Sequence, residues 1–166
     1  AAATETLKMA RIANMDYRDA ADGMTVAIRG FNMEMTDAAH VTDVYSKVAA
    51  VTASDTQELV TAMSKTASSA ASVGSSFENT TAMLAVMVEA TRESPQNIGS
   101  AMKSIISRYG EMTSDPTKLV DSEGEEMSLN KVDKALSSVG ITLKDVNGQF
   151  RDFDEVILEL SSKWDT

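Results

Sequence analysis

The chain has 166 residues, enough for one ordinary domain, and its 43% hydrophobic and 24% charged residues are typical of a folded globular protein. A formal net charge of −10 at pH 7 argues against binding to nucleic-acid phosphate or to an anionic membrane surface, and the lack of cysteine excludes disulfides and thiolate sites. Two prolines, eight glycines and 5% aromatic residues favour a helical architecture.

No signal peptide or membrane-spanning segment is visible in the sequence. A helix needs about 20 apolar residues to cross a bilayer, and the most apolar run, Ala82 to Val88, is far shorter. The chain begins with Ala-Ala-Ala rather than Met and stops shortly after Trp164. We therefore expect it to be a fragment of a longer chain.

The N-terminal stretch carries a heptad-like stripe of mostly small residues at alternating steps of three and four. It predicts one long helix or two stacked helices. Gly23 and Gly30 lie off the stripe and weaken a helix by about 1 kcal/mol each relative to alanine, which suggests a break near Asp22-Gly23. The stripe consists of Ala10, Ala13, Tyr17, Ala20, Met24, Ala27 and Phe31.

Two further helices are predicted before residue 74. Thr36 or Asp37 opens the first, and Ser54 with Gln57 has the form of a capping box for a helix from Asp55 to Val73. Gly74 suits a left-handed terminator of that helix. The predicted buried faces are Val41, Val44, Tyr45, Val48 and Val51 in the first helix, and Leu59, Met63, Ala67 and Ala70 in the second.

The central stretch, residues 74–112, predicts a pair of helices joined at a sharp boundary. Ser75 and Ser76 offer hydroxyls to the free N–H groups of a helix that begins near Phe77. Pro95 suits the first position of the second helix, because the N–H that it lacks would be unpaired there. The inward positions are Phe77, Leu84, Val88 and Thr91, widened by Met83, Val86, Met87 and Ala90, and then Ile98, Met102, Ile105, Tyr109 and Met112.

The C-terminal third begins with an exposed acidic loop over residues 113–127 and continues as helix, hairpin and helix over 128–166. Gly140 stops the first of these helices, and Asn147-Gly148 is the commonest two-residue hairpin turn. Asp152 with Glu155 opens the last helix. The predicted inward positions are Val132, Ala135, Leu136 and Val139, then Val156, Ile157, Leu160 and Trp164.

These elements predict an all-α fold: a bundle of about seven helices with one short β-hairpin near the C-terminus. We expect a single helical domain over 1–166, made of N-terminal helices (1–73), the central pair, the acidic loop and the C-terminal part. Leu84, Ile105 and Trp164 are expected to be buried.

No catalytic, cofactor-binding or metal-binding residue is predicted, and no cofactor. Aligning Gly148 with the glycine of a calcium loop places Leu143 where the first carboxylate should be, so the hairpin interpretation is preferred. His40 is the only histidine, which rules out a histidine cluster and leaves a position on a helix surface. The acidic loop is interpreted as solvated rather than as a cation site, and the eleven methionines as core filler rather than a binding surface. The chain is therefore predicted not to be an enzyme.

The run SFENTTAMLAVMVEATRESPQNIGSAMKSIISRYGEM, followed later by VGITLKDVNGQFRDFDEVILELSSKW, resembles bacteriophage and prophage tail tape measure proteins. The resemblance covers about residues 20–166 and is best at 74–109 and 139–164. It implies a structural virion component located in the tail, and in the host cytoplasm during assembly, that takes part in tail assembly, length determination and genome ejection.

The implied partners are tail tube and tail tip proteins, with a homo-oligomer left open. Neither direct nucleic-acid binding by this fragment nor membrane contact, except through other parts of the parent chain, is expected. Family members are typically several times longer, so this fragment alone is not the ruler. The competing hypothesis is a helical interaction module unrelated to tails, such as a secretion or signalling adaptor, which the Met-rich faces would suit equally well. A third hypothesis, an unrecognised enzyme, would need a deep polar pocket.

Overall fold

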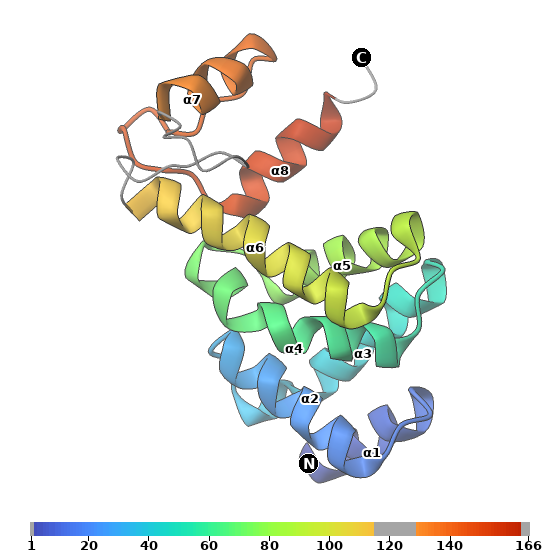
Figure 1. The fold of residues 1–166 in the computed structure, drawn as a ribbon. Coiled ribbons are helices and arrows are strands. Elements are labelled where there is room, and N and C mark those ends of the chain that lie inside the picture. The colour runs from blue at the N-terminus through green and yellow to red at the C-terminus, as the bar shows by residue number, and fades with distance from the viewer. Residues whose placement is uncertain (1, 115–128, 164–166) are drawn as a thin grey trace. The chain divides into compact units, whose positions relative to one another are not determined.

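The computed structural model describes residues 2–114 and 129–163 (Figure 1). Over these residues it is all-helical, as predicted, with eight α-helices, one short 3-10 helix and no strand. The elements are α1 (Ala2–Ile12), α2 (Tyr17–Gly30), η1 (Met35–Asp37), α3 (Ala38–Val51), α4 (Thr56–Ser72), α5 (Phe77–Thr91), α6 (Pro95–Ser114), α7 (Leu129–Ser138) and α8 (Phe153–Ser162). The predicted acidic loop over 113–127 begins too early, because α6 runs to Ser114. The rest of that loop, Trp164 and the side chain of Val132 lie outside what is described.

The chain forms two compact units. The N-terminal unit comprises residues 1–72 and 76–104, and the C-terminal unit comprises residues 73–75 and 105–166. The single domain over 1–166, with the internal boundaries proposed from the sequence, stays a prediction.

Glycines bring α2 close to α4 in the N-terminal unit. A Cβ on Gly23 would lie 2.3 Å from Cγ1 of Val60, and one on Gly30 would lie 2.6 Å from Cβ of Ala67. The two glycines therefore face α4 and permit a close approach of the helices. The predicted break near Asp22-Gly23 is wrong, because α2 runs through it.

The break in the N-terminal stripe falls earlier, between α1 and α2. Asn14 there adopts a left-handed φ of 50°, a conformation that asparagine tolerates better than most residues. The stripe is otherwise buried at Ala10, Ala13, Ala20, Met24 and Ala27, whereas Tyr17 is exposed.

The beginnings of α3 and α4 confirm one predicted cap and correct another. Asp37 is the N-cap of α3, as expected. At α4 the reciprocal capping bonds join Asp55 and Glu58, at 2.9 and 2.7 Å, rather than Ser54 and Gln57. Glu58 occupies the third position of α4, from which a side chain reaches the backbone N–H of the N-cap residue, whereas Gln57 lies one position too early to do so. Ser54 is instead buried, and its hydroxyl lies 2.7 Å from that of Thr52.

The buried faces of α3 and α4 agree with the prediction except at one end. Leu59, Met63, Ala67 and Ala70 are all buried in α4, which packs against α2 and α5. In α3, Val41 and Tyr45 are buried, but Val51, in the last turn, is 83% exposed. The apolar periodicity of the sequence extends to Val51, beyond the part of α3 that packs against other helices.

Aromatic rings close the core of the N-terminal unit around Phe77. Its ring makes edge contacts with Phe31, at 5.6 Å between centroids, and with Tyr45, at 5.1 Å. Tyr45 is completely buried, and its hydroxyl has no hydrogen-bond partner among the described residues. Burial raises the pKa of this hydroxyl far above its ordinary value, so it stays neutral.

Replacing Tyr45 with phenylalanine is therefore expected to raise the free energy of unfolding by about 1 kcal/mol, because a buried hydroxyl without a partner is costly. The matched control is Tyr109→Phe, since the Tyr109 hydroxyl donates to the Arg151 carbonyl at 2.6 Å. There the same change should cost about 0.5–1.5 kcal/mol. Urea denaturation of both variants measures the difference, and equal losses would mean that the Tyr45 hydroxyl has a partner after all.

Helix α6 begins at Pro95, as predicted, but its buried face is rotated from the one expected. Ile98 and Met102 are buried, and Ile106 is fully buried, whereas Ile105 is 49% exposed. The predicted burial of Ile105 is therefore wrong, and that of Leu84 is confirmed. Within the N-terminal unit Gly99 is buried, and its missing Cβ lets the backbone of α6 approach α4.

The C-terminal unit has its own core, contributed by the end of α6, by α8 and by the segment between α7 and α8. The core consists of Met112, Ile141, Leu143 and Val156, with Tyr109, Leu136, Phe150 and Leu160 packed against it. Gly140 ends α7 with a φ of +76°, as predicted for a helix terminator. Val139, predicted inward, is 47% exposed.

The predicted β-hairpin is not formed. A turn is present at Asn147-Gly148, but the flanking residues make a single bridge, Lys144 with Phe150, rather than a ladder. The Asp145 carboxylate accepts the backbone N–H groups of Asn147 and Gln149, each at 2.9 Å. Such side-chain bonds compete with strand pairing, and here they close the turn on itself.

Candidate functional site

The distinctive stretch that begins at Gly74 is anchored within the C-terminal unit. Gly74 has a φ of +74°, and a Cβ there would lie 2.1 Å from Oδ1 of Asp152. The N–H of Phe153 donates to the Val73 carbonyl at 3.0 Å, and the Ser75 hydroxyl donates to Oδ1 of the buried Asp154 at 2.6 Å. We call residues 73–75 and 152–154 the anchor; it joins two segments far apart in the sequence.

The two serines predicted as caps have different roles. Ser76 is the N-cap of α5, and its hydroxyl accepts the N–H of Asn79 at 3.1 Å, as expected. Ser75 does not cap α5 but belongs to the anchor. No local signal in the sequence identifies Asp154 as its partner, because the two residues are 79 positions apart.

Arg151 ties the segment before α8 to α8 itself. Its Nη1 donates to Oε2 of Glu159 at 2.7 Å and to the Thr142 carbonyl at 3.0 Å. The bond to Glu159 raises the pKa of Arg151, so the guanidinium stays charged. Tyr109 is half-buried, and burial raises the pKa of its hydroxyl, which keeps it a donor to the Arg151 carbonyl.

The Asp145 turn has the features of a structural element rather than a cation site. The backbone N–H of Gln149, followed by that of Asn147, lowers the pKa of Asp145 and holds its carboxylate ionised. Both N–H groups donate to the same oxygen, Oδ1. Over residues 2–114 and 129–163, no group of three or more potential metal-ligating side chains comes together.

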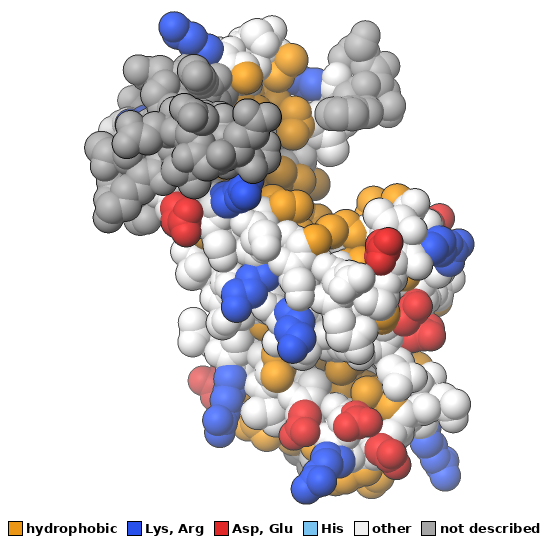
Figure 2. Space-filling model, viewed as in Figure 1, with side chains coloured by type: hydrophobic (Ala, Val, Ile, Leu, Met, Phe, Trp, Pro, Cys, Tyr) orange, Lys and Arg blue, Asp and Glu red, His pale blue; other side chains and the backbone are white. Residues whose placement is uncertain are grey.

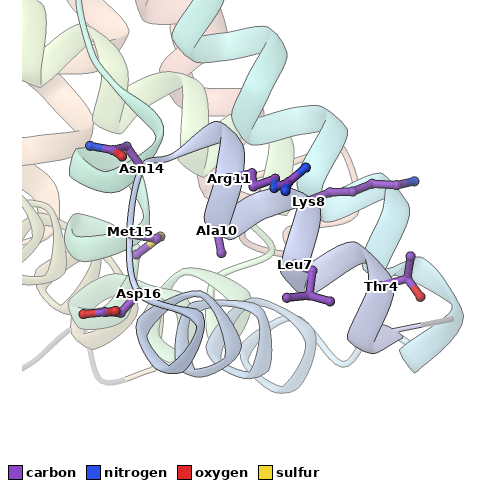
Figure 3. A pocket seen from close by; sticks show the side chains of 8 residues that line it. All are labelled: Thr4, Leu7, Lys8, Ala10, Arg11, Asn14, Met15 and Asp16. Atoms are coloured by element: carbon purple, nitrogen blue, oxygen red, sulfur yellow. The ribbon is translucent and has the colours of Figure 1, made fainter.

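A groove of about 740 Å³ lies beside α1 and its turn into α2 (Figure 3). Its lining residues are Thr4, Leu7, Lys8, Ala10, Arg11, Asn14, Met15 and Asp16. Lys8 is paired with Glu5 at 2.7 Å, and the cationic ends of Lys8 and Arg11 lie far from the carboxylate of Asp16. Because the polar groups do not converge, the groove lacks the arrangement that catalysis needs.

The remaining sequence candidates occupy surfaces. His40 is exposed on α3 and pairs with Glu78 of α5. The methionines divide, with Met9, Met24, Met63, Met102 and Met112 buried and Met35 60% exposed. No described helix is long and apolar enough to cross a membrane. The prediction that the chain holds no catalytic, cofactor or metal residue stays a prediction.

Comparison with known proteins gives two matches. A family model described as "Phage-related minor tail protein" matches residues 1–166. The chain is also 28% identical over 156 residues to the "Tape measure protein" of Pneumococcus phage Dp-1, a match that covers 94% of this chain and 12% of that relative. No solved structure matches significantly.

Proposed function

Because the chain belongs to the phage-related minor tail protein family, we propose that it is a folded module of a longer tape measure protein, acting in tail assembly and genome ejection. The family makes it a structural component of the phage tail, and the match over the whole chain carries the proposal. The named relative extends far beyond this region, since the chain spans only 12% of its length. Its partners are proposed to be tail tube and tail tip proteins, met first in the host cytoplasm during assembly. A secretion or signalling adaptor has no comparable support.

The compact packing argues that the module is not part of a measuring rod. A rod converts residues into length at about 1.5 Å per helical residue, and 166 residues in one helix would span about 250 Å. Here the longest described helix, α6, has 20 residues and would span about 30 Å. Gly74, Pro95 and Gly140 all lie at helix ends, and the helices on either side of Gly74, α4 and α5, pack against each other.

Deleting residues 75–112 in the intact parent gene distinguishes the two roles. The deletion removes α5 and most of α6, so a folded module would be destroyed, and we expect tail assembly or ejection to be lost. If the segment were rod, the 38 missing residues would shorten the tail by about 57 Å. Electron microscopy of the particles and a plaque assay measure both outcomes.

The control is a deletion of equal length in a long helical stretch of the parent outside residues 1–166. That deletion should give viable particles with shorter tails if such a stretch is the ruler. Infectious particles with tails uniformly shortened by deletion of residues 75–112 would overturn the module proposal.

A further inference from the structure

Helix α5 has two apolar faces, although a surface helix ordinarily has one. The inner face is buried in the N-terminal unit and consists of Phe77, Thr80, Thr81, Leu84, Ala85 and Val88. On the outer face Ala82, Val86 and Ala90 are exposed, and Val86 is 60% exposed. Hydrophobic side chains are visible at the surface over this helix (Figure 2). The outer face therefore has the composition of an interface without a described neighbour.

The outer face has a defined pattern. Ala82, Val86 and Ala90 follow each other at steps of four, which aligns them in a row about 12 Å long. The half-buried Met83 and Met87 form one edge of this row. We call these five residues the outer stripe of α5. Small residues flanked by flexible methionines suit close contact with a second helix, because methionine adapts its shape to the partner.

Acidic residues border the other edge of the outer stripe. At 100° per residue, Glu78 and Glu89 lie three turns apart on the same side of α5, and both are exposed. Glu93, just beyond the end of the helix, is also exposed. Glu78 pairs with His40 of α3, and Nη1 of Arg92 donates to the Ala53 carbonyl at 3.1 Å. The carboxyl end of α5 adds to the negative potential.

We propose that the outer stripe of α5 docks an amphipathic helix of another tail protein, one with apolar residues at helical spacing and Lys or Arg along one edge. The apolar row supplies the contact area, and the acidic edge selects a basic partner and its orientation. A second copy of this chain is disfavoured, since each copy carries a net charge of −10 and the same acidic edge. Only the identification of the partner as a tail protein rests on the proposed function.

Two designed 20-residue amphipathic peptides test the proposal, one with a leucine stripe and a lysine edge and its twin with glutamate at every lysine position. Fluorescence anisotropy with the 166-residue chain at physiological salt measures both affinities. The lysine peptide is expected to bind at least tenfold more tightly than its twin. Val86→Asp should weaken the lysine peptide at least tenfold, because it places a charge without a partner in the centre of the contact. Equal binding of the two peptides would overturn the proposal.

Val51→Asp is the matched control, because Val51 is 83% exposed in the same unit but lies on α3. This variant should bind the lysine peptide like the unchanged chain, and equal losses in the two aspartate variants would show that the stripe is not the site. Glu89→Lys should reduce the preference for the lysine peptide over its twin. An unchanged preference would show that the acidic edge does not select the partner, and it would contradict the proposal of a basic partner. Circular dichroism confirms that each variant is folded.

The chain contains no cysteine, so Val86→Cys provides a unique thiol on the outer stripe. Rapid reaction with a maleimide in the chain alone, slowed by the lysine peptide, is expected. Slow reaction without peptide would mean that the chain covers its own stripe. Self-association that disappears in Val86→Asp, seen by sedimentation, would assign the stripe to a second copy; either result overturns the proposal. These titrations involve no tail, so their failure leaves the assembly role to be decided by the deletion of residues 75–112.

Discussion

Replacing Ile106 with alanine should lower the free energy of unfolding by about 2–5 kcal/mol, whereas the same change at Ile105 should cost less than about 1 kcal/mol. The two residues are adjacent in α6 and chemically identical, so the difference between their losses reports the effect of burial alone. Ile106 is fully buried, and its truncation would leave a cavity in packed surroundings. Ile105 already has half of its surface in water, so little apolar area is lost from the core.

Urea denaturation of the 166-residue chain, followed by circular dichroism, measures the two changes. Equal losses would contradict the difference in burial, and a larger loss for Ile105→Ala would show that the buried face of α6 is the one expected from the sequence. Ile106→Val provides an internal check, because removing one methyl should cost about 0.5–1.5 kcal/mol and leave the same face buried.

The second large effect is expected from Gly99→Ala, which should lower the free energy of unfolding although the same change in a helix usually raises it. In an exposed helix interior the change from glycine to alanine stabilises by about 1 kcal/mol. At Gly99 the new Cβ would lie 2.3 Å from the Ala62 carbonyl oxygen, so the backbones of α4 and α6 would have to separate. Separation also stretches the bond from the Thr66 hydroxyl to the Gly99 carbonyl, now 3.1 Å. We expect a loss of about 1–3 kcal/mol.

Gly110→Ala in the same helix is the control. Of the described residues, its Cβ would meet only Val73, at 3.3 Å from Cγ1, and a small shift of that side chain relieves the contact. The expected change is within about 1 kcal/mol of zero, because the gain in helix propensity offsets the tight contact. Thermal unfolding of the two variants makes the comparison, and a stabilised Gly99→Ala would show that α4 and α6 are not held this closely.

Residues that act through local chemistry allowed the helix ends to be predicted. Gly74 and Gly140 adopt the left-handed conformation expected of helix terminators, and Pro95 occupies the first position of its helix. Ser76 caps α5 through its own hydroxyl. In each case the determining atoms lie within a few residues, so a single sequence contains the information.

Choices that depend on a distant neighbour could not be made from the sequence. Periodicity places Ile105 and Ile106 within 100° of each other, so it does not decide which of the two is buried. The Asn147-Gly148 turn was predicted, but the strands failed because the Asp145 carboxylate takes the N–H groups beside the turn. The same limit applies to the candidate surfaces. The residues of the outer stripe of α5 other than Ala82 are predicted from the sequence as a widened core face, because periodicity does not separate an exposed apolar residue from a buried one.

The anchor bears on the order in which the chain folds during synthesis. Residues 73–75 connect α4 to α5, yet their partners Phe153 and Asp154 leave the ribosome almost 80 residues later. Helices α1 to α5 make their mutual contacts much earlier, so they can pack while the Val73 carbonyl and the Ser75 hydroxyl still bind water. Closing a loop of this length costs conformational entropy, which the two hydrogen bonds offset only once they have formed. The anchor is therefore expected to form late in folding. A nascent chain stalled before residue 153 would therefore hold a folded N-terminal unit beside an incomplete C-terminal one.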